Sequence, residues 1–266
     1  MIPATALEDI SVEVIRESTP TYLPTITSTP IPISQVEEGD KAFFNGDWDI
    51  AIDEYMNAWK TDLDPDVQTA ALLGLGRTYY ETKEYAAALD SLRRIKDLYP
   101  ESPHLPETYF ALAQVHEALD RYSEAAEDYQ TYLDLRPGLI DSYVQERRGD
   151  SLTATGAYTM AINAYQEAIR APRLDDVIPL EIKIGNSYYN LGDYQTALVV
   201  YTDIYTRTNS DYVKASMNFM TGLSHIQLGE NQEGYQAYLD SVENYPLSYD
   251  TYLGLINLVD AGYPVS

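Results

Sequence analysis

The apolar positions of this chain recur with a period of 36 or 37 residues. Each copy holds two segments in which apolar residues lie three and four apart, the spacing of an amphipathic helix, and a short turn joins the two segments. Six residues that we call the anchors open the second segments: Trp48, Tyr85, Tyr122, Tyr158, Tyr194 and Asn231. The pattern predicts six helix–turn–helix units.

Small residues and rings stand at fixed distances from the anchors. Nine residues before each anchor come Gly39, Gly76, Ala113, Gly149, Gly185 and Gly222, and three after it come Ala51, Ala88, Ala125, Ala161, Ala197 and Gly234. Seven after it come Tyr55, Leu92, Tyr129, Tyr165, Tyr201 and Tyr238. We expect the small residues to let the two helices approach closely and the tyrosines to fill the space around them, so that a bulky replacement overpacks the crossing.

The predicted helices cover residues 34–45 and 48–60, 66–82 and 85–98, 104–119 and 122–135, 140–155 and 158–170, 176–191 and 194–207, 211–228 and 231–244, with a last helix at 249–261. One helix pair cannot bury its apolar face alone, but a stack of pairs makes a continuous core. The predicted fold class is therefore all-α, an α-solenoid in a single domain over residues 34–266.

Residues 1–33 differ from the repeats in composition. They hold a Thr/Pro-rich tract from Ser18 to Pro32, in which proline removes backbone donors and disfavours helix. We interpret residues 1–33 as a flexible linker. Tracts of this kind often connect an exported domain to a membrane anchor, which suggests an extracytoplasmic or periplasmic location with a membrane tether.

The unit built from Gly185, Tyr188, Gly192-Asp193-Tyr194, Ala197 and Tyr201 resembles the tetratricopeptide repeat, as do its counterparts over about residues 34–245. The resemblance implies a right-handed superhelix whose first helices line a concave groove that holds peptides or partner helices. The stretch YPESPHLPETYFALAQ at 99–114 is similar to repeats of bacterial envelope proteins. The segment from Tyr245 to Val265 resembles the helical region that precedes the catalytic domain of soluble lytic murein transglycosylases.

The candidate binding site is a stripe on the first helices, twelve, eight and five residues before each anchor, because these positions share one helical face. We predict that seven of them contact a ligand: Arg77, Tyr80, Gln114, Glu117, Asp150, Asn186 and Tyr189. Glu146 and Asp150 are expected to repel the C-terminal carboxylate that some tetratricopeptide proteins bind. The alternative is a solvated wall with no ligand.

The net charge of −25 and the pI near 4.2 argue against nucleic acid and anionic membrane as partners, because both are bound through Lys and Arg. No apolar run approaches the length of a spanning helix. The sequence holds no cysteine and no motif of a catalytic, cofactor or metal site, and its three histidines are interpreted as structural.

Two functions follow from these patterns. The first is a non-enzymatic scaffold that binds a protein or peptide through its concave face, in the bacterial cell envelope. The alternative is the non-catalytic module of a lytic murein transglycosylase, with peptidoglycan as a further partner. The transglycosylase domain's Glu-Ser followed by a Gly-Leu-Met-Gln motif is missing from this chain, and Glu17-Ser18 and Glu101-Ser102 are isolated dipeptides without that context.

Overall fold

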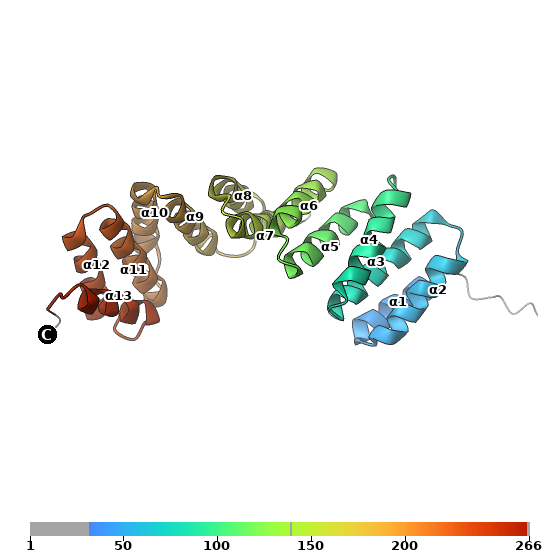
Figure 1. The fold of residues 1–266 in the computed structure, drawn as a ribbon, viewed down its shortest axis with the longest axis horizontal. Helices are drawn as coiled ribbons and strands as arrows, with labels where there is room; N and C mark the ends of the chain where they lie inside the picture. Colours follow the sequence, from blue (N-terminus) through green and yellow to red (C-terminus); the bar gives the residue numbers. More distant parts are fainter. Residues whose placement is uncertain (1–31, 139, 265–266) are drawn as a thin grey trace, which may run out of the picture. The chain divides into compact units, whose positions relative to one another are not determined.

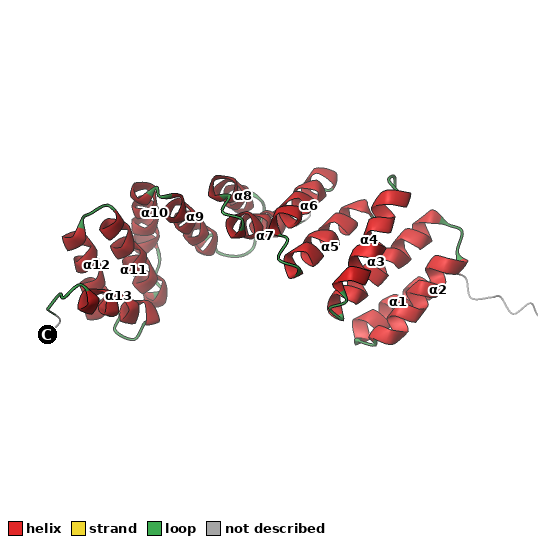
Figure 2. Cartoon of the chain, in the orientation of Figure 1, coloured by secondary structure: helices red, strands yellow, loops and turns green. Residues whose placement is uncertain are grey.

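The computed structural model describes residues 32–138 and 140–264, which form thirteen helices and no strand (Figures 1 and 2). The helices are α1 (Pro32–Asn45), α2 (Trp48–Thr61), α3 (Pro65–Glu81), α4 (Tyr85–Leu98), α5 (Leu105–Ala118), α6 (Tyr122–Leu135), α7 (Asp141–Ala154), α8 (Tyr158–Arg170), α9 (Ile178–Leu191), α10 (Tyr194–Arg207), α11 (Asp211–Gln227), α12 (Asn231–Asn244) and α13 (Tyr249–Asp260). All thirteen predicted helices are confirmed, each within two residues of its predicted ends. The linker predicted for residues 1–33 lies almost wholly outside the described residues and stays a prediction.

Each unit turns from its first to its second helix through one residue in the left-handed region, two positions before the anchor. These residues are Gly46, Lys83, Asp120, Gly156, Gly192 and Gly229, with φ between 56° and 87°. Glycine takes this conformation without strain, and Gly192 is the left-handed C-cap of α9. Lys83 and Asp120 adopt it at a cost that the packing on both sides must offset. The uniform turn fixes every anchor as the first residue of a second helix.

Within a unit, the small residue before the anchor makes room for the buried ring after it. A Cβ added at Gly185 would lie 2.5 Å from Cε1 of Tyr201, and one added at Gly149 would lie 2.4 Å from Cε1 of Tyr165. Tyr201 is fully buried, and so are the tyrosines at this position in four other units and Leu92 in the remaining one. This observation confirms the predicted close approach at Gly185 and explains why glycine occupies the position.

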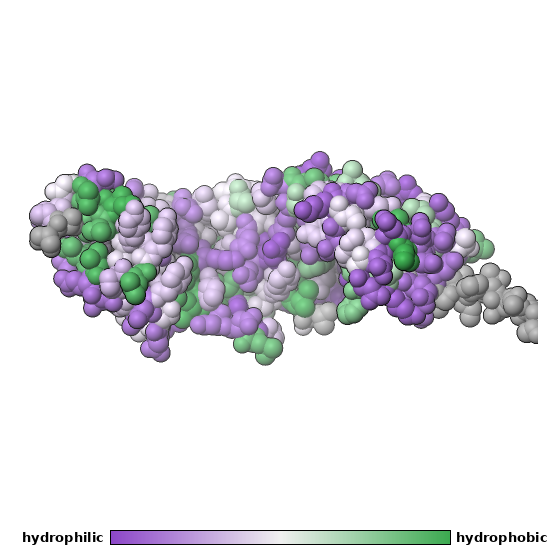
Figure 3. Space-filling model, turned by 90° about the horizontal axis from the view of Figure 1, so that it is seen from below, coloured by the Kyte–Doolittle hydropathy of each residue, from purple (hydrophilic) through white to green (hydrophobic). Residues whose placement is uncertain are grey.

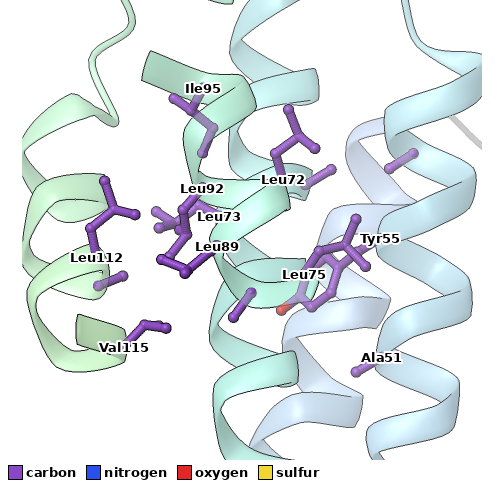
Figure 4. Close-up of a cluster of buried hydrophobic side chains, with 14 of the residues drawn as sticks. Ala51, Tyr55, Leu72, Leu73, Leu75, Leu89, Leu92, Ile95, Leu112 and Val115 are labelled. Carbon is purple, nitrogen blue, oxygen red and sulfur yellow. The ribbon is translucent and has the colours of Figure 1, made fainter. Parts of the chain in front are cut away.

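The units stack in chain order, because each helix packs against the next one along the array. Figure 4 shows the core at the N-terminal end, where side chains of α2, α3, α4 and α5 point toward one another. Leu72, Leu92 and Ile95 are almost completely buried there. Burial of apolar surface between neighbouring pairs is the main stabilising term of such an array. Within the described part of the chain, no helix has the length and apolar character to cross a bilayer.

Candidate functional site

Two neighbouring clefts lie on the face formed by the first helices of the N-terminal and central units. The first cleft holds about 420 Å³ and is lined by Phe43, Leu73, Arg77, Tyr80, Glu81, Glu107, Phe110, Ala111 and Gln114, from α1, α3 and α5. The second cleft holds about 370 Å³ and is lined by Tyr80, Gln114, Glu117, Ala118, Tyr122, Arg147, Asp150 and Ser151, from α3, α5, α6 and α7. Tyr80 and Gln114 line both, so the two clefts adjoin. Their volumes lie in the range of ligand pockets.

The first cleft is mainly apolar and carries one exposed cation. Phe110 forms part of its wall and packs on Tyr129 and Tyr132, with ring centroids 5.8 and 5.6 Å apart. The guanidinium of Arg77 lies over the ring of Phe43, 4.9 Å from its centroid. The carboxylate of Glu107 pairs with Arg136. The cleft therefore presents apolar walls together with the exposed charges of Arg77 and Glu81, an arrangement that suits an apolar side chain next to a polar backbone.

The second cleft contains a carboxylate that is held by three donors. Glu117 pairs with Arg147, and it accepts hydrogen bonds from the hydroxyl of Tyr129 at 2.8 Å and from the hydroxyl of Ser151 at 2.9 Å. Burial raises the pKa of Tyr129 well above its ordinary value. Burial opposes the charge on Arg147, but its hydrogen bonds with Tyr129 and Glu117 outweigh burial and raise its pKa. Glu117 is thus a neutralised part of the wall.

A similar cluster follows one unit later. The ammonium of Lys183 on α9 lies 2.9 Å from Glu146 and 2.7 Å from Asp150, both on α7. Asp150 also accepts a hydrogen bond from the hydroxyl of Tyr165 at 2.9 Å. Burial lowers the pKa of Lys183, but the hydrogen bonds that its ammonium donates to both carboxylates dominate and raise it. The expectation that Glu146 and Asp150 repel an anionic ligand is therefore weakened, because one cation compensates half of their charge.

Five of the seven predicted site residues line these clefts, namely Arg77, Tyr80, Gln114, Glu117 and Asp150. The other two, Asn186 and Tyr189 of α9, line neither cleft. Asn186 accepts a hydrogen bond from the hydroxyl of Tyr201 at 2.8 Å, and the ring of Tyr189 packs edge-on against Tyr194 at 5.2 Å. Both side chains therefore serve packing within their own unit. Contact with a ligand stays a prediction for all seven.

The stripe of three positions per helix missed residues that also line each cleft. Each cleft is lined by stripe positions of both first helices and, in addition, by residues of the second of these helices that lie one position further along. Arg147 and Ser151 are of this second kind. The signal in the sequence was the basic residue eleven before two consecutive anchors, Arg147 and Lys183, each one unit after acidic stripe positions.

The described residues bring together no group of three or more carboxylate, imidazole or thiol side chains placed to hold a metal ion. His116 is buried and pairs with Asp128 at 2.7 Å, and His225 pairs with Glu230 at the same distance. These contacts agree with a structural interpretation of both histidines.

Sequence profiles of the tetratricopeptide repeat match residues 66–137, 110–176 and 182–249. Together the matches cover more than half of the chain, which therefore belongs to the tetratricopeptide repeat family. Proteins of this family are typically scaffolds that bind other proteins and have no catalytic activity of their own. Among curated proteins, none matches this sequence.

Solved structures with the same fold share little sequence with this chain. A tetratricopeptide repeat protein from Parabacteroides merdae ATCC 43184 is 13% identical, with a TM-score of 0.58 over 87% of this chain and 86% of that one. MamA of AMB-1 is 18% identical, with a TM-score of 0.54 over 66% of this chain and 91% of MamA. PilW, a type IV pilus biogenesis factor, is 16% identical, with a TM-score of 0.53 over 86% of this chain and all of PilW. These similarities bear out the α-solenoid fold.

Proposed function

We propose that this chain is a non-enzymatic scaffold that binds an extended segment of a partner protein across the two clefts between α3, α5 and α7. The observation that carries the proposal is the continuity of the clefts, since Tyr80 and Gln114 belong to both. An extended segment that enters the first cleft with one side chain can continue into the second without leaving the surface.

The chemistry of the clefts indicates what kind of segment fits. The apolar wall around Leu73 and Phe110 suits an aliphatic or aromatic side chain. The amide of Gln114 and the hydroxyl of Tyr80 can bond a peptide backbone in either direction, because each both donates and accepts. The internal ion pairs neutralise most of the acidic charge in the second cleft, so the segment need not be basic.

Selection from a random peptide library on the immobilised protein tests this proposal. We expect the selected peptides to share an apolar or aromatic residue and to bind about tenfold or more weakly to a variant with Arg77→Ala and Gln114→Ala. The matched control is Arg93→Ala with Gln130→Ala, which removes the same two residue types from second helices.

The variant Asn186→Ala with Tyr189→Ala decides between positions along the face. If it abolishes binding while the Arg77 and Gln114 variant binds as the wild type does, the site lies at α9 and the proposal is wrong. A thermal melt of each variant must accompany the titration, because Asn186 holds the hydroxyl of Tyr201.

A location in the bacterial cell envelope is part of the proposal and rests on the Thr/Pro-rich tract and the envelope-type repeat sequence alone. Fractionation of cells that express the full-length gene tests it, and recovery in the cytoplasm would refute it. The alternative, a non-catalytic module of a transglycosylase that contacts peptidoglycan, rests on the segment from Tyr245 to Val265 alone. Sedimentation with purified peptidoglycan tests that alternative, since a protein that stays in the supernatant contradicts it.

A further inference from the structure

We propose that the outward face of α13 is a second interaction surface, separate from the clefts, and that it takes an amphipathic helix with basic residues. We define this surface, the α13 face, by Tyr249, Tyr252, Ile256 and Val259. Their side chains are 67%, 57%, 37% and 54% exposed. The four lie within a quarter of the circumference of one helix, because they are three, seven and ten residues apart. Figure 3 shows hydrophobic residues in green gathered at this end of the array, on the left.

The opposite side of α13 is packed in the same way as the first helix of a unit. Thr251, Gly254 and Leu258 are buried against the preceding pair, and α13 contacts both α11 and α12. A Cβ added at Gly254 would lie 3.0 Å from Cδ1 of Tyr238. The helix also ends in the left-handed turn of the other units, at Gly262 with φ of 72°. In its packing, α13 is therefore the first helix of a further unit.

This equivalence places the α13 face on the stripe. Alignment of Gly262 with Gly229 puts Tyr252, Ile256 and Val259 at the stripe positions that Phe219, Leu223 and Ile226 hold in α11. The stripe residues of α11 are half-buried beside α13, but those of α13 are exposed. The three positions on α13 hold large apolar or aromatic groups with exposed side chains. Exposed apolar groups in such a cluster mark an interaction surface.

A helix is the occupant that this geometry favours. Apolar residues at intervals of three, four and three form a straight ridge, and an amphipathic helix lays its own apolar side against such a ridge. A following first helix packs beside α1, α3 and α11 in the same way. An extended strand finds no sheet edge on α13 with which to pair.

The charge of this end decides the polarity of the partner. After Lys214 the sequence holds no Lys or Arg, but it holds Glu230, Glu233, Asp240, Glu243, Asp250 and Asp260. Asp260 is exposed beside the face. A partner helix with Lys or Arg along its flanks gains from this field, and a second copy of this chain, with its own charge of −25, is repelled by it.

Fluorescence anisotropy with a designed peptide tests the surface. The probe is an amphipathic Leu/Lys helix of about 18 residues, which is about five turns. Two further probes separate the contribution of charge from that of apolar contact. The first is a Leu/Glu peptide with the same apolar spacing, and the second is a Ser/Lys peptide with the same charge. We expect the Leu/Lys peptide to bind at least about tenfold more tightly than either.

Paired variants place the binding on α13. The variant Tyr252→Ser, Ile256→Ser and Val259→Ser leaves the net charge unchanged. We expect it to bind the Leu/Lys peptide with an affinity about tenfold or more below that of the wild type. The control Ile50→Ser, Met160→Ser and Val199→Ser removes three apolar groups of similar exposure, 55%, 51% and 64%, from second helices. The affinity of this control for the Leu/Lys peptide is expected to lie within about twofold of that of the wild type. All six side chains are exposed at least in part, so both variants should fold, which a melting curve checks.

Three results would overturn the inference. Equal affinity of the α13 variant and the wild type would place the peptide elsewhere. Equal affinity of the Ser/Lys and Leu/Lys peptides would reduce the effect to charge. A concentration-dependent dimer that the α13 variant abolishes would assign the face to a second copy. The Arg77 and Gln114 variant should bind the Leu/Lys peptide as the wild type does, which separates this surface from the clefts.

Discussion

The N-terminal and central units differ in the size and charge of the residue that lies eleven positions before the anchor. This residue faces the buried side chain of the preceding unit. In the N-terminal units it is Gly74 or Ala111, and a Cβ at Gly74 would lie 2.4 Å from Cε1 of Tyr55. In the central units it is Arg147, which donates to Tyr129, or Lys183, whose ammonium lies 5.6 Å from the ring centroid of Tyr165.

The size of this residue correlates with how the first helices meet. With Gly74 and Ala111 in place, α1 packs on α3 and α3 packs on α5. The backbones of α5 and α7 lie further apart, and so do those of α7 and α9. Arg147 and Lys183 bridge these gaps through ion pairs. The first helices of neighbouring units therefore meet by apolar packing at the N-terminal end and through charged hydrogen bonds in the centre, although α6 with α7 and α8 with α9 bury apolar side chains between the central units as well.

The largest effect should come from the apolar end. Leu92→Ala removes a fully buried side chain from the cluster in Figure 4 and leaves a cavity. We expect it to lower the free energy of unfolding by about 2–5 kcal/mol. Because no charge is involved, urea titrations at low and high salt should give the same loss. A loss of stability that depends on salt would contradict the contrast between the N-terminal and the central units.

The glycine–tyrosine contact is common to both regions and should come next. Gly185→Leu places a side chain where the ring of Tyr201 lies, and overpacking of this kind costs about 1–3 kcal/mol. Thermal unfolding measures it, with Ala86→Leu at an exposed position of α4 as the control. An unchanged melting temperature for Gly185→Leu would refute the packing described for every unit.

The central ion pairs should contribute less. Arg147→Met leaves Glu117, whose side chain is only 11% exposed, with two neutral donors. We expect a loss of about 1–2 kcal/mol, smaller than for an interior charge because the guanidinium itself is partly exposed. The double-mutant cycle with Glu117→Gln isolates the pair, and its coupling energy should fall as salt is added. A coupling of zero at low salt would show that the bridge does not stabilise the centre.

Alkaline pH should destabilise the whole array while having no effect near neutrality. Burial raises the pKa of Tyr238 to about 12, with a hydrogen bond from Asn257 opposing it, and burial raises the pKa of Tyr55 and Tyr201 as well. Below about pH 10 these phenols are neutral in both states. Between that pH and the folded pKa, only the unfolded chain loses the protons, so stability falls as pH rises.

Absorbance at 295 nm during a pH titration checks this expectation. The five fully buried tyrosines should ionise only as the helical circular dichroism is lost, after the exposed phenols have titrated. Ionisation of all 25 tyrosines before any unfolding would show that the rings are accessible.

The fold could be predicted from the sequence because its determinants are local and occur six times. The small residue before each anchor and the large residue after it report one contact, and the structure shows that contact at Gly185 and Tyr201. The candidate site was accessible only in part. The stripe positions predict Arg77 on α3 and Gln114 on α5, but Arg147 and Ser151 also line a cleft, and which neighbouring residues do so depends on how far apart the helices lie.

The sequence also does not show which polar side chains of the candidate site are bound to other side chains of the same chain. Asn186 looks available on a helical wheel, but the hydroxyl of Tyr201 reaches it from the second helix of the same unit. Asp150 looks like an uncompensated charge until Lys183 of the next unit is placed beside it. Which polar groups remain open to a ligand depends on distances between elements, which periodicity alone does not give.

Site-specific photocross-linking tests the central claim most directly, that the first-helix face between α3, α5 and α7 holds the partner segment. Benzoylphenylalanine replaces the exposed Ala118 in the second cleft or, as the control, the exposed Ala86 on α4. The probe is a labelled peptide from the library selection, and mass spectrometry maps the adducts. We predict adducts from position 118 and none from position 86; equal yields at both positions, or adducts from 86 alone, would contradict the account.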